Sequence, residues 1–174
     1  MTISYSHLGI CVANLDRSVY FYSSGLNFQL ISTQVVEGDS AMFGFPAPRL
    51  TVAYLRHGPL VIELIEYEAP NAPPAGNVRR LNQVGFSHLA LEVEDILKAR
   101  DRIVGHGGSQ LHDTPAITEG PGVAYPEGAL RCTASLMCSD PDGTRIEILK
   151  SAGSFPGQLA TRMCWEPSVL DLKD

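Results

Sequence analysis

The chain has 174 residues, of which 44% are hydrophobic and 18% charged, as is typical of a soluble globular protein with one domain or two small modules sharing a core. Its net charge of −6, with 13 scattered lysines and arginines, argues against a nucleic-acid partner, and no apolar run is long enough for a membrane helix. The N-terminus lacks the basic segment of a signal peptide, and the four cysteines show no CxxC spacing. We therefore expect a cytoplasmic protein with free thiols and no membrane partner.

The first part of the chain predicts a strand, a helix and three further strands. An apolar strand begins at His7, and Asn14 is the predicted N-cap of a helix over residues 15–24 that ends at Gly25. The three strands that follow are predicted over residues 28–36, 49–56 and 60–67. Residues 1–67 therefore form a first βαβββ module.

The second part repeats this order after a linker, residues 68–84, that is rich in proline, alanine and asparagine. A strand begins at Ser87, and Asp95 is the predicted N-cap of a helix over residues 96–104. The three strands of this half are predicted over residues 110–113, 131–138 and 144–150. Residues 85–150 are thus a second βαβββ module, and residues 151–174 are a C-terminal extension that belongs to neither repeat.

A long loop interrupts the second module over residues 114–129. It contains three prolines and three glycines. Loops of this length inside a compact domain are usually functional lids or mobile segments.

Two short motifs are duplicated between the modules. Ser6-His7-Leu8 recurs as Ser87-His88-Leu89, and Ile62-Glu63-Leu64 recurs as Ile146-Glu147-Ile148. Because side chains alternate along a strand, a glutamate flanked by two core residues points to the opposite face of the sheet.

Together the duplicated motifs supply two imidazoles and two carboxylates. These are a sufficient inner shell for one divalent transition metal ion, and Zn, Ni, Co, Mn or Fe would each suit it. The sequence therefore predicts a metal site formed by His7, Glu63, His88 and Glu147.

These motifs resemble the vicinal oxygen chelate superfamily, which includes glyoxalase I, methylmalonyl-CoA epimerase, extradiol dioxygenases, and the fosfomycin and bleomycin resistance proteins. The resemblance covers about residues 5–150 and rests on the segments 6–12, 16–22, 61–64, 87–91 and 140–143. It implies an α+β fold in which paired βαβββ modules form a curled sheet around a metal cavity. It also implies a homodimer.

By position, the four predicted ligands match those of the glyoxalase I and epimerase branches, whereas the dioxygenase branch uses only two histidines and one glutamate. The resemblance thus implies a metal-dependent isomerase or lyase that acts on a small carbonyl compound through a metal-stabilised enolate. Glu63 and Glu147 would be catalytic, moving the proton while also binding the metal. Glu37 is a further candidate base by analogy with the epimerases.

We expect a small-molecule substrate that differs from the substrate of glyoxalase I. Cys11 and Tyr67 stand where bacterial glyoxalase I has an arginine and an asparagine that contact glutathione, so we do not expect a glutathione adduct. Arg131 and Tyr125 could supply polar contacts to the substrate from the second module.

Two other functions remain open from the sequence: an Fe(II) extradiol-type dioxygenase, and a non-catalytic resistance protein that binds an antibiotic or another ligand. The sequence also does not decide whether the modules pair within one chain or exchange between the two chains of a dimer.

Overall fold

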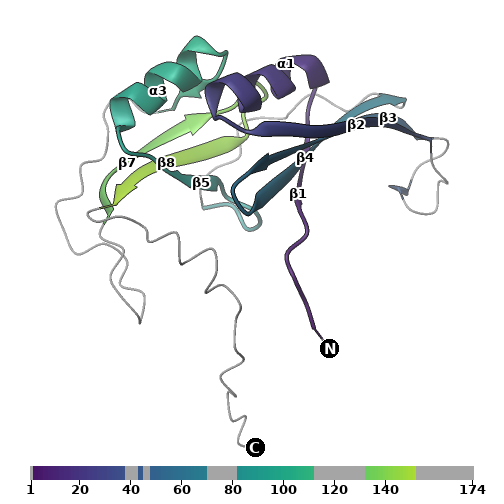
Figure 1. The fold of residues 1–174 in the computed structure, drawn as a ribbon, viewed down its shortest axis with the longest axis horizontal. Coiled ribbons are helices and arrows are strands. Elements are labelled where there is room, and N and C mark those ends of the chain that lie inside the picture. The colour runs from purple at the N-terminus through teal and green to yellow at the C-terminus, as the bar shows by residue number, and fades with distance from the viewer. Residues whose placement is uncertain (1, 38–42, 45–47, 70–81, 112–131, 152–174) are drawn as a thin grey trace, which may run out of the picture.

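The computed structural model describes residues 2–37, 43–44, 48–69, 82–111 and 132–151 (Figure 1). After its first strand the first module has a helical segment, and its four-stranded sheet has the order β1-β4-β3-β2. β1 and β4 are parallel, and the other neighbours are antiparallel. The elements are β1 (Leu8–Cys11), α1 (Leu15–Tyr20), the π-helix η1 (Phe21–Gly25), β2 (Gln29–Glu37), β3 (Arg49–His57) and β4 (Leu60–Ala69).

The second module has the same connectivity. Its four-stranded sheet has the order β5-β8-β7-β6, and its first strand again runs parallel to its last. The elements are β5 (Leu89–Glu92), α3 (Ile96–Gly105), β6 (Ser109–Gln110), β7 (Cys132–Ser139) and β8 (Arg145–Ser151). The predicted α+β fold of paired βαβββ modules is therefore confirmed.

Both predicted N-caps are confirmed. The Asn14 side chain accepts a hydrogen bond from the Arg17 N–H at 2.8 Å. The Asp95 carboxylate accepts from two N–H groups of the first turn of α3, each at 3.0 Å. Each cap satisfies donors that have no partner within the helix and so starts the helix at the predicted residue.

The first helix differs from the prediction in its last turn. The pattern predicted one α-helix over residues 15–24, but the chain widens into the π-helix η1 from Phe21. Ser23 donates its hydroxyl hydrogen to the Val19 carbonyl at 2.6 Å, and the consecutive residues Phe21 and Tyr22 are both fully buried. The two aromatic rings pack edge to face with centroids 5.1 Å apart, an arrangement of neighbours that the wider turn accommodates.

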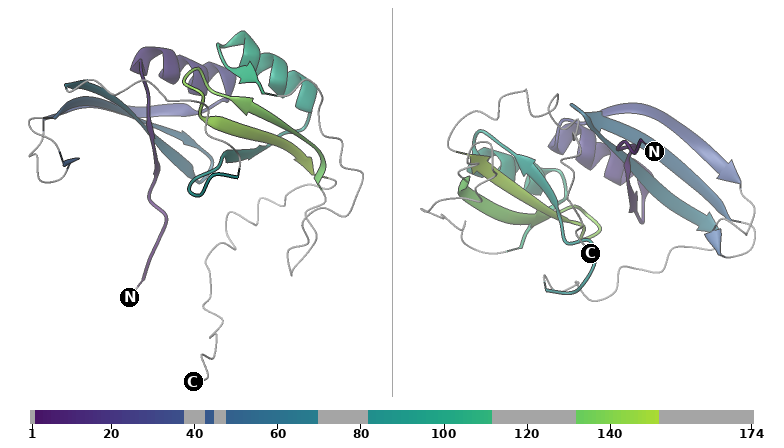
Figure 2. Two further views of the ribbon diagram at one scale, coloured as in Figure 1. Left: turned by 180° about the vertical axis from the view of Figure 1, so that it is seen from behind. Right: turned by 90° about the horizontal axis from the view of Figure 1, so that it is seen from below.

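One hydrophobic core lies between the helices and the two sheets and is shared by both modules. Figures 1 and 2 show α1 and α3 on the same side of the sheets, and the opposite faces carry no helix among the described residues. Core residues from both modules include Phe21, Leu55, Ile62, Ile103, Leu136 and Ile146.

Polar contacts also join the modules. The buried Tyr22 hydroxyl donates to Asp140 Oδ2 at 3.0 Å, and Arg17 forms an ion pair with Asp142. The helix side of the molecule is therefore closed by contacts within one chain, which leaves the other face of each sheet open.

None of the described helices is long and apolar enough to cross a membrane. The long loop 114–129, with Tyr125, lies outside the described residues, as do Arg131, most of the linker and the extension from residue 152.

Candidate metal centre

The first histidine–glutamate pair lies on the open face of the first sheet. His7 immediately precedes β1, and Glu63 is on β4 opposite Gly9 in the parallel register. His7 Nε2 lies 3.3 Å from Glu63 Oε2. Since Gly9 has no side chain, nothing from β1 fills the space in front of the carboxylate, and a Cβ added there would lie 3.7 Å from Glu63 Oε2.

The second pair repeats this arrangement in the second sheet. His88 immediately precedes β5, and Glu147 is on β8 opposite Ala90. His88 Nε2 lies 3.1 Å from Glu147 Oε2. The duplicated motifs therefore place equivalent side chains at equivalent positions of the two modules.

Each histidine also has a serine on its other ring nitrogen. Ser6 Oγ lies 3.0 Å from His7 Nδ1, and Ser87 Oγ lies 3.1 Å from His88 Nδ1. A histidine whose Nδ1–H donates to an oxygen keeps the lone pair of Nε2 available, which is the form that binds metal ions. The serines of the repeated motif thus suit Nε2 coordination in both modules.

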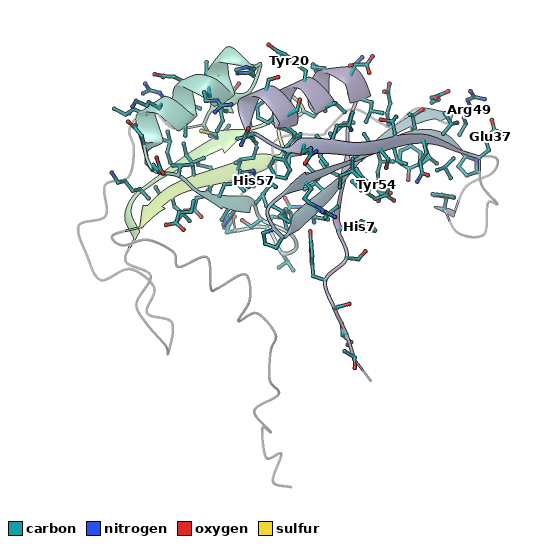
Figure 3. All side chains as sticks on the ribbon, in the orientation of Figure 1. His7, Tyr20, Glu37, Arg49, Tyr54 and His57 are labelled. Atoms are coloured by element: carbon teal, nitrogen blue, oxygen red, sulfur yellow. The ribbon has the colours of Figure 1, made fainter. Side chains whose placement is uncertain are left out.

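Tyr54 is a site residue that no sequence motif predicted. It lies on β3 directly opposite Glu63 and donates its hydroxyl hydrogen to Glu63 Oε1 at 2.5 Å. Its ring also packs edge-on to His7, with ring centroids 5.7 Å apart, on the side of the sheet away from α1 (Figure 3). The hydrogen bond to Glu63, with burial and the charge of Glu63, raises the pKa of Tyr54.

Cys11 and Tyr67 lie beside Glu63 on the same face. Partial burial of the Cys11 thiol and the charge of Asp142 raise its pKa. Burial and the negative charges of Cys11 and Glu63 raise the pKa of Tyr67. Both side chains are therefore uncharged at neutral pH and supply no cation to this surface.

The four predicted ligands form two separate pairs. In the part of the chain that the structure describes, no three histidine, cysteine, aspartate or glutamate side chains come together as a metal-binding group. The chemistry of each pair nevertheless fits a transition metal, because an imidazole nitrogen and a partly buried carboxylate oxygen lie within 3.3 Å of each other. His7, Glu63, His88 and Glu147 remain the residues that could hold a metal ion.

Glu37 does not lie near either pair. It ends β2 and accepts from Arg49 Nη1 at 2.8 Å, while Arg49 Nε also donates to Glu68 at 2.7 Å. Figure 3 shows Glu37 and Arg49 at the far end of the sheet from His7. The analogy that made Glu37 a candidate base is therefore not supported by its position.

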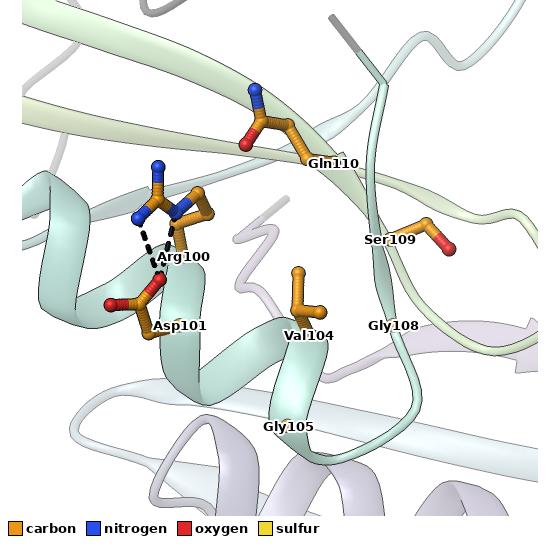
Figure 4. A pocket seen from close by; sticks show the side chains of 7 residues that line it. All are labelled: Arg100, Asp101, Val104, Gly105, Gly108, Ser109 and Gln110. Carbon is orange, nitrogen blue, oxygen red and sulfur yellow. Dashed lines mark hydrogen bonds and ion pairs between the residues drawn. The ribbon is translucent and has the colours of Figure 1, made fainter. Parts of the chain in front are cut away.

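A separate pocket lies between α3 and β6 (Figure 4). Arg100 faces it and donates from Nε and Nη2 to Asp101 Oδ1, at 2.9 and 2.7 Å. None of the four predicted ligands lines this pocket, so it is distinct from the candidate metal centre.

Comparison with known proteins agrees with this fold. Residues 4–148 match the family profile described as the Glyoxalase/Bleomycin resistance protein/Dioxygenase superfamily. A probable lactoylglutathione lyase of Synechocystis sp. is 27% identical over 150 residues, which cover 84% of this chain and 94% of that protein. A lactoylglutathione lyase of Salmonella typhimurium is 25% identical over 155 residues, covering 87% and 95%.

Solved structures show the same fold. A glyoxalase family protein from Bacillus cereus superposes with a TM-score of 0.69 at 19% identity, covering 88% of this chain and 97% of that chain. The family profile spans both modules and all four predicted ligands, and the relatives are aligned over most of their length. The chain therefore belongs to the Glyoxalase/Bleomycin resistance protein/Dioxygenase superfamily.

Proposed function

We propose that this protein is a metal-dependent lyase or isomerase of the glyoxalase type, acting on a small carbonyl compound. The observation that carries the proposal is the pair of equivalent His–Glu contacts, at 3.3 Å in the first module and 3.1 Å in the second. The names of the curated relatives support a lyase.

In this proposal His7, Glu63, His88 and Glu147 hold one divalent ion, for which Zn, Ni, Co, Mn and Fe are all chemically suitable. A bound divalent ion would polarise the substrate carbonyl, acidify the adjacent C–H and stabilise the enolate. In the proposed reaction, Glu63 and Glu147 would take up that proton and return it to the neighbouring carbon.

We further propose that the complete site forms in a homodimer, where the first module of one chain faces the second module of its partner. A transition-metal site needs about four ligands, and one module supplies a single pair. Apolar side chains on the segments leading into β1 and β5 support a covered surface there: Ile3 is 83% exposed, Tyr5 59%, Val84 97% and Phe86 55%.

The proposed substrate carries no glutathione. A carboxylate such as that of glutathione is bound most strongly by a cationic side chain. At the position where bacterial glyoxalase I has its arginine this chain has Cys11, whose raised pKa keeps the thiol neutral. Tyr67 likewise offers an aromatic ring and an un-ionised hydroxyl.

A cytoplasmic location of the protein stays a prediction of the sequence.

The proposal is tested by elemental analysis of protein purified without chelators or an affinity metal. We expect near-stoichiometric Zn, Ni, Co or Mn, and loss of that metal in Glu63→Gln and His88→Ala. Glu37→Gln is the matched control, since Glu37 makes a surface ion pair with Arg49 and its loss should leave the metal content unchanged.

Other results would replace the proposal. Iron together with cleavage of catechols would identify a dioxygenase. No metal after reconstitution would leave a ligand-binding protein without chemistry, and full metal content in both variants would mean that the ligands are wrongly assigned.

A further inference from the structure

The two histidine–glutamate pairs differ in the strand beside the glutamate. In the first sheet Tyr54 is opposite Glu63, and in the second sheet Met137 is opposite Glu147. The Tyr54 hydroxyl donates to Glu63 at 2.5 Å, whereas a methionine thioether has no hydrogen to donate. The two modules therefore have equivalent predicted ligands. They differ in the residue opposite the glutamate, which donates a hydrogen bond to Glu63 and is a methionine opposite Glu147.

The two carboxylate oxygens of Glu63 have different partners. Oε1 accepts from the phenol, and Oε2 faces His7 Nε2 at 3.3 Å. Rotation of the carboxylate about its last bond would break the bond to Tyr54, so the bond favours one orientation with Oε2 towards His7. A short hydrogen bond to a carboxylate is among the stronger ones in proteins.

The tyrosine is itself held in place. Its ring makes an edge-on contact with His7 at an interplanar angle of 84°, and its backbone is in the middle of β3, paired on one side with β4 and on the other with β2. A donor on a central strand of a sheet gives a more precise support than one on a loop.

We propose that Tyr54 is a positioning residue that fixes Glu63 as a ligand through one oxygen, and that no side chain of the described residues gives Glu147 the same restraint. The proposal rests on the proposed metal site. The support acts on Glu63, so removal of the Tyr54 hydroxyl is expected to loosen this one ligand of the shared metal site and to leave the contact of His88 with Glu147 as it is.

The experiment compares wild type with Tyr54→Phe, using Co(II) as the probe. Phenylalanine keeps the ring against His7 and removes only the hydroxyl. Tyr20→Phe is the matched control, because it removes the hydroxyl of an exposed tyrosine that packs on His106 outside the site. Co(II) affinity is measured by competition with a chromophoric chelator, and the visible absorption of the Co(II) protein reports the geometry of its ligands.

We expect Tyr54→Phe to bind Co(II) about 10- to 100-fold more weakly than wild type, with an altered visible spectrum, and Tyr20→Phe to match wild type. An unaltered Co(II) spectrum in Tyr54→Phe, whatever its affinity, would overturn the positioning role while the metal site itself stands. Wild type that binds no Co(II) would overturn both this proposal and the proposed function, so the two failures are distinguishable.

Discussion

Asp140 is a buried carboxyl group at the contact between the modules. Its Oδ2 accepts from the Tyr22 hydroxyl at 3.0 Å, and its Oδ1 accepts from the N–H groups of Asp142 and Thr144 at 2.9 and 2.8 Å. These bonds favour the ionised form, but burial outweighs them and raises the pKa of Asp140.

This shift predicts a pH dependence of stability. An acid whose pKa is higher in the folded than in the unfolded state contributes stability that is fully present below the unfolded value, about 3.9 for aspartate, and lost as the pH rises through the folded value. Asp140→Asn keeps the shape of the side chain and removes its titration. The free energy of unfolding of wild type minus that of the variant should therefore fall as the pH rises above about 3.9, measured by urea unfolding over a pH series. A difference that grows with pH would contradict this explanation.

At the scale of the secondary-structure elements, α3, η1 and β7 meet at Gly108. A Cβ added to Gly108 would lie 2.5 Å from the Ser139 carbonyl oxygen, 2.7 Å from the Phe21 ring and 2.8 Å from Ile103 Cγ2. These distances are shorter than van der Waals contact, so the approach of the three elements depends on the missing side chain.

Gly108→Ala should lower the free energy of unfolding by about 1–3 kcal/mol, because the methyl group would overpack this junction. Gly105, the last residue of α3, is the control, since a Cβ added there meets nothing within 4 Å. Gly105→Ala should raise the free energy of unfolding by about 0.5–1 kcal/mol through better helix propensity. Denaturant unfolding of both variants checks the pair, and equal effects at the two positions would show that the junction is not tightly packed.

At the scale of the whole molecule, the arrangement of the two modules determines which predicted ligands can come together. The helix sides share one core within a chain, while each open sheet face carries one His–Glu pair. A protein built in this way can gather four ligands by placing the open face of a second chain against its own.

Mixed dimers test this arrangement. If sites form between chains, a dimer of one His7→Ala chain and one His88→Ala chain has one site with all four ligands and one site that lacks both histidines. We expect dimers purified through two different peptide tags to bind one metal ion with wild-type affinity, although neither variant alone does so. If the sites form within single chains, every site in the mixed dimer lacks a histidine, and no tight binding will be recovered.

The sequence alone was enough to predict the features that depend on near neighbours along the chain. The N-caps Asn14 and Asp95, the βαβββ order and the alternation that sets Glu63 and Glu147 apart from their core neighbours are all local patterns, and the structure agrees with each. The repeat placed each histidine and glutamate at equivalent points because strand periodicity depends only on the backbone.

The features that the sequence did not predict come from contacts between distant residues. The bond of Tyr54 to Glu63 depends on the register of β3 against β4, and the bond of Tyr22 to Asp140 joins residues 118 positions apart. The widening of the first helix at Phe21 likewise accompanies the burial of two consecutive aromatic residues in a core shared with the second module. These two hydrogen bonds and the widened helix depend on tertiary contacts, because strand register and module packing are determined by the fit of whole surfaces and not by any local pattern.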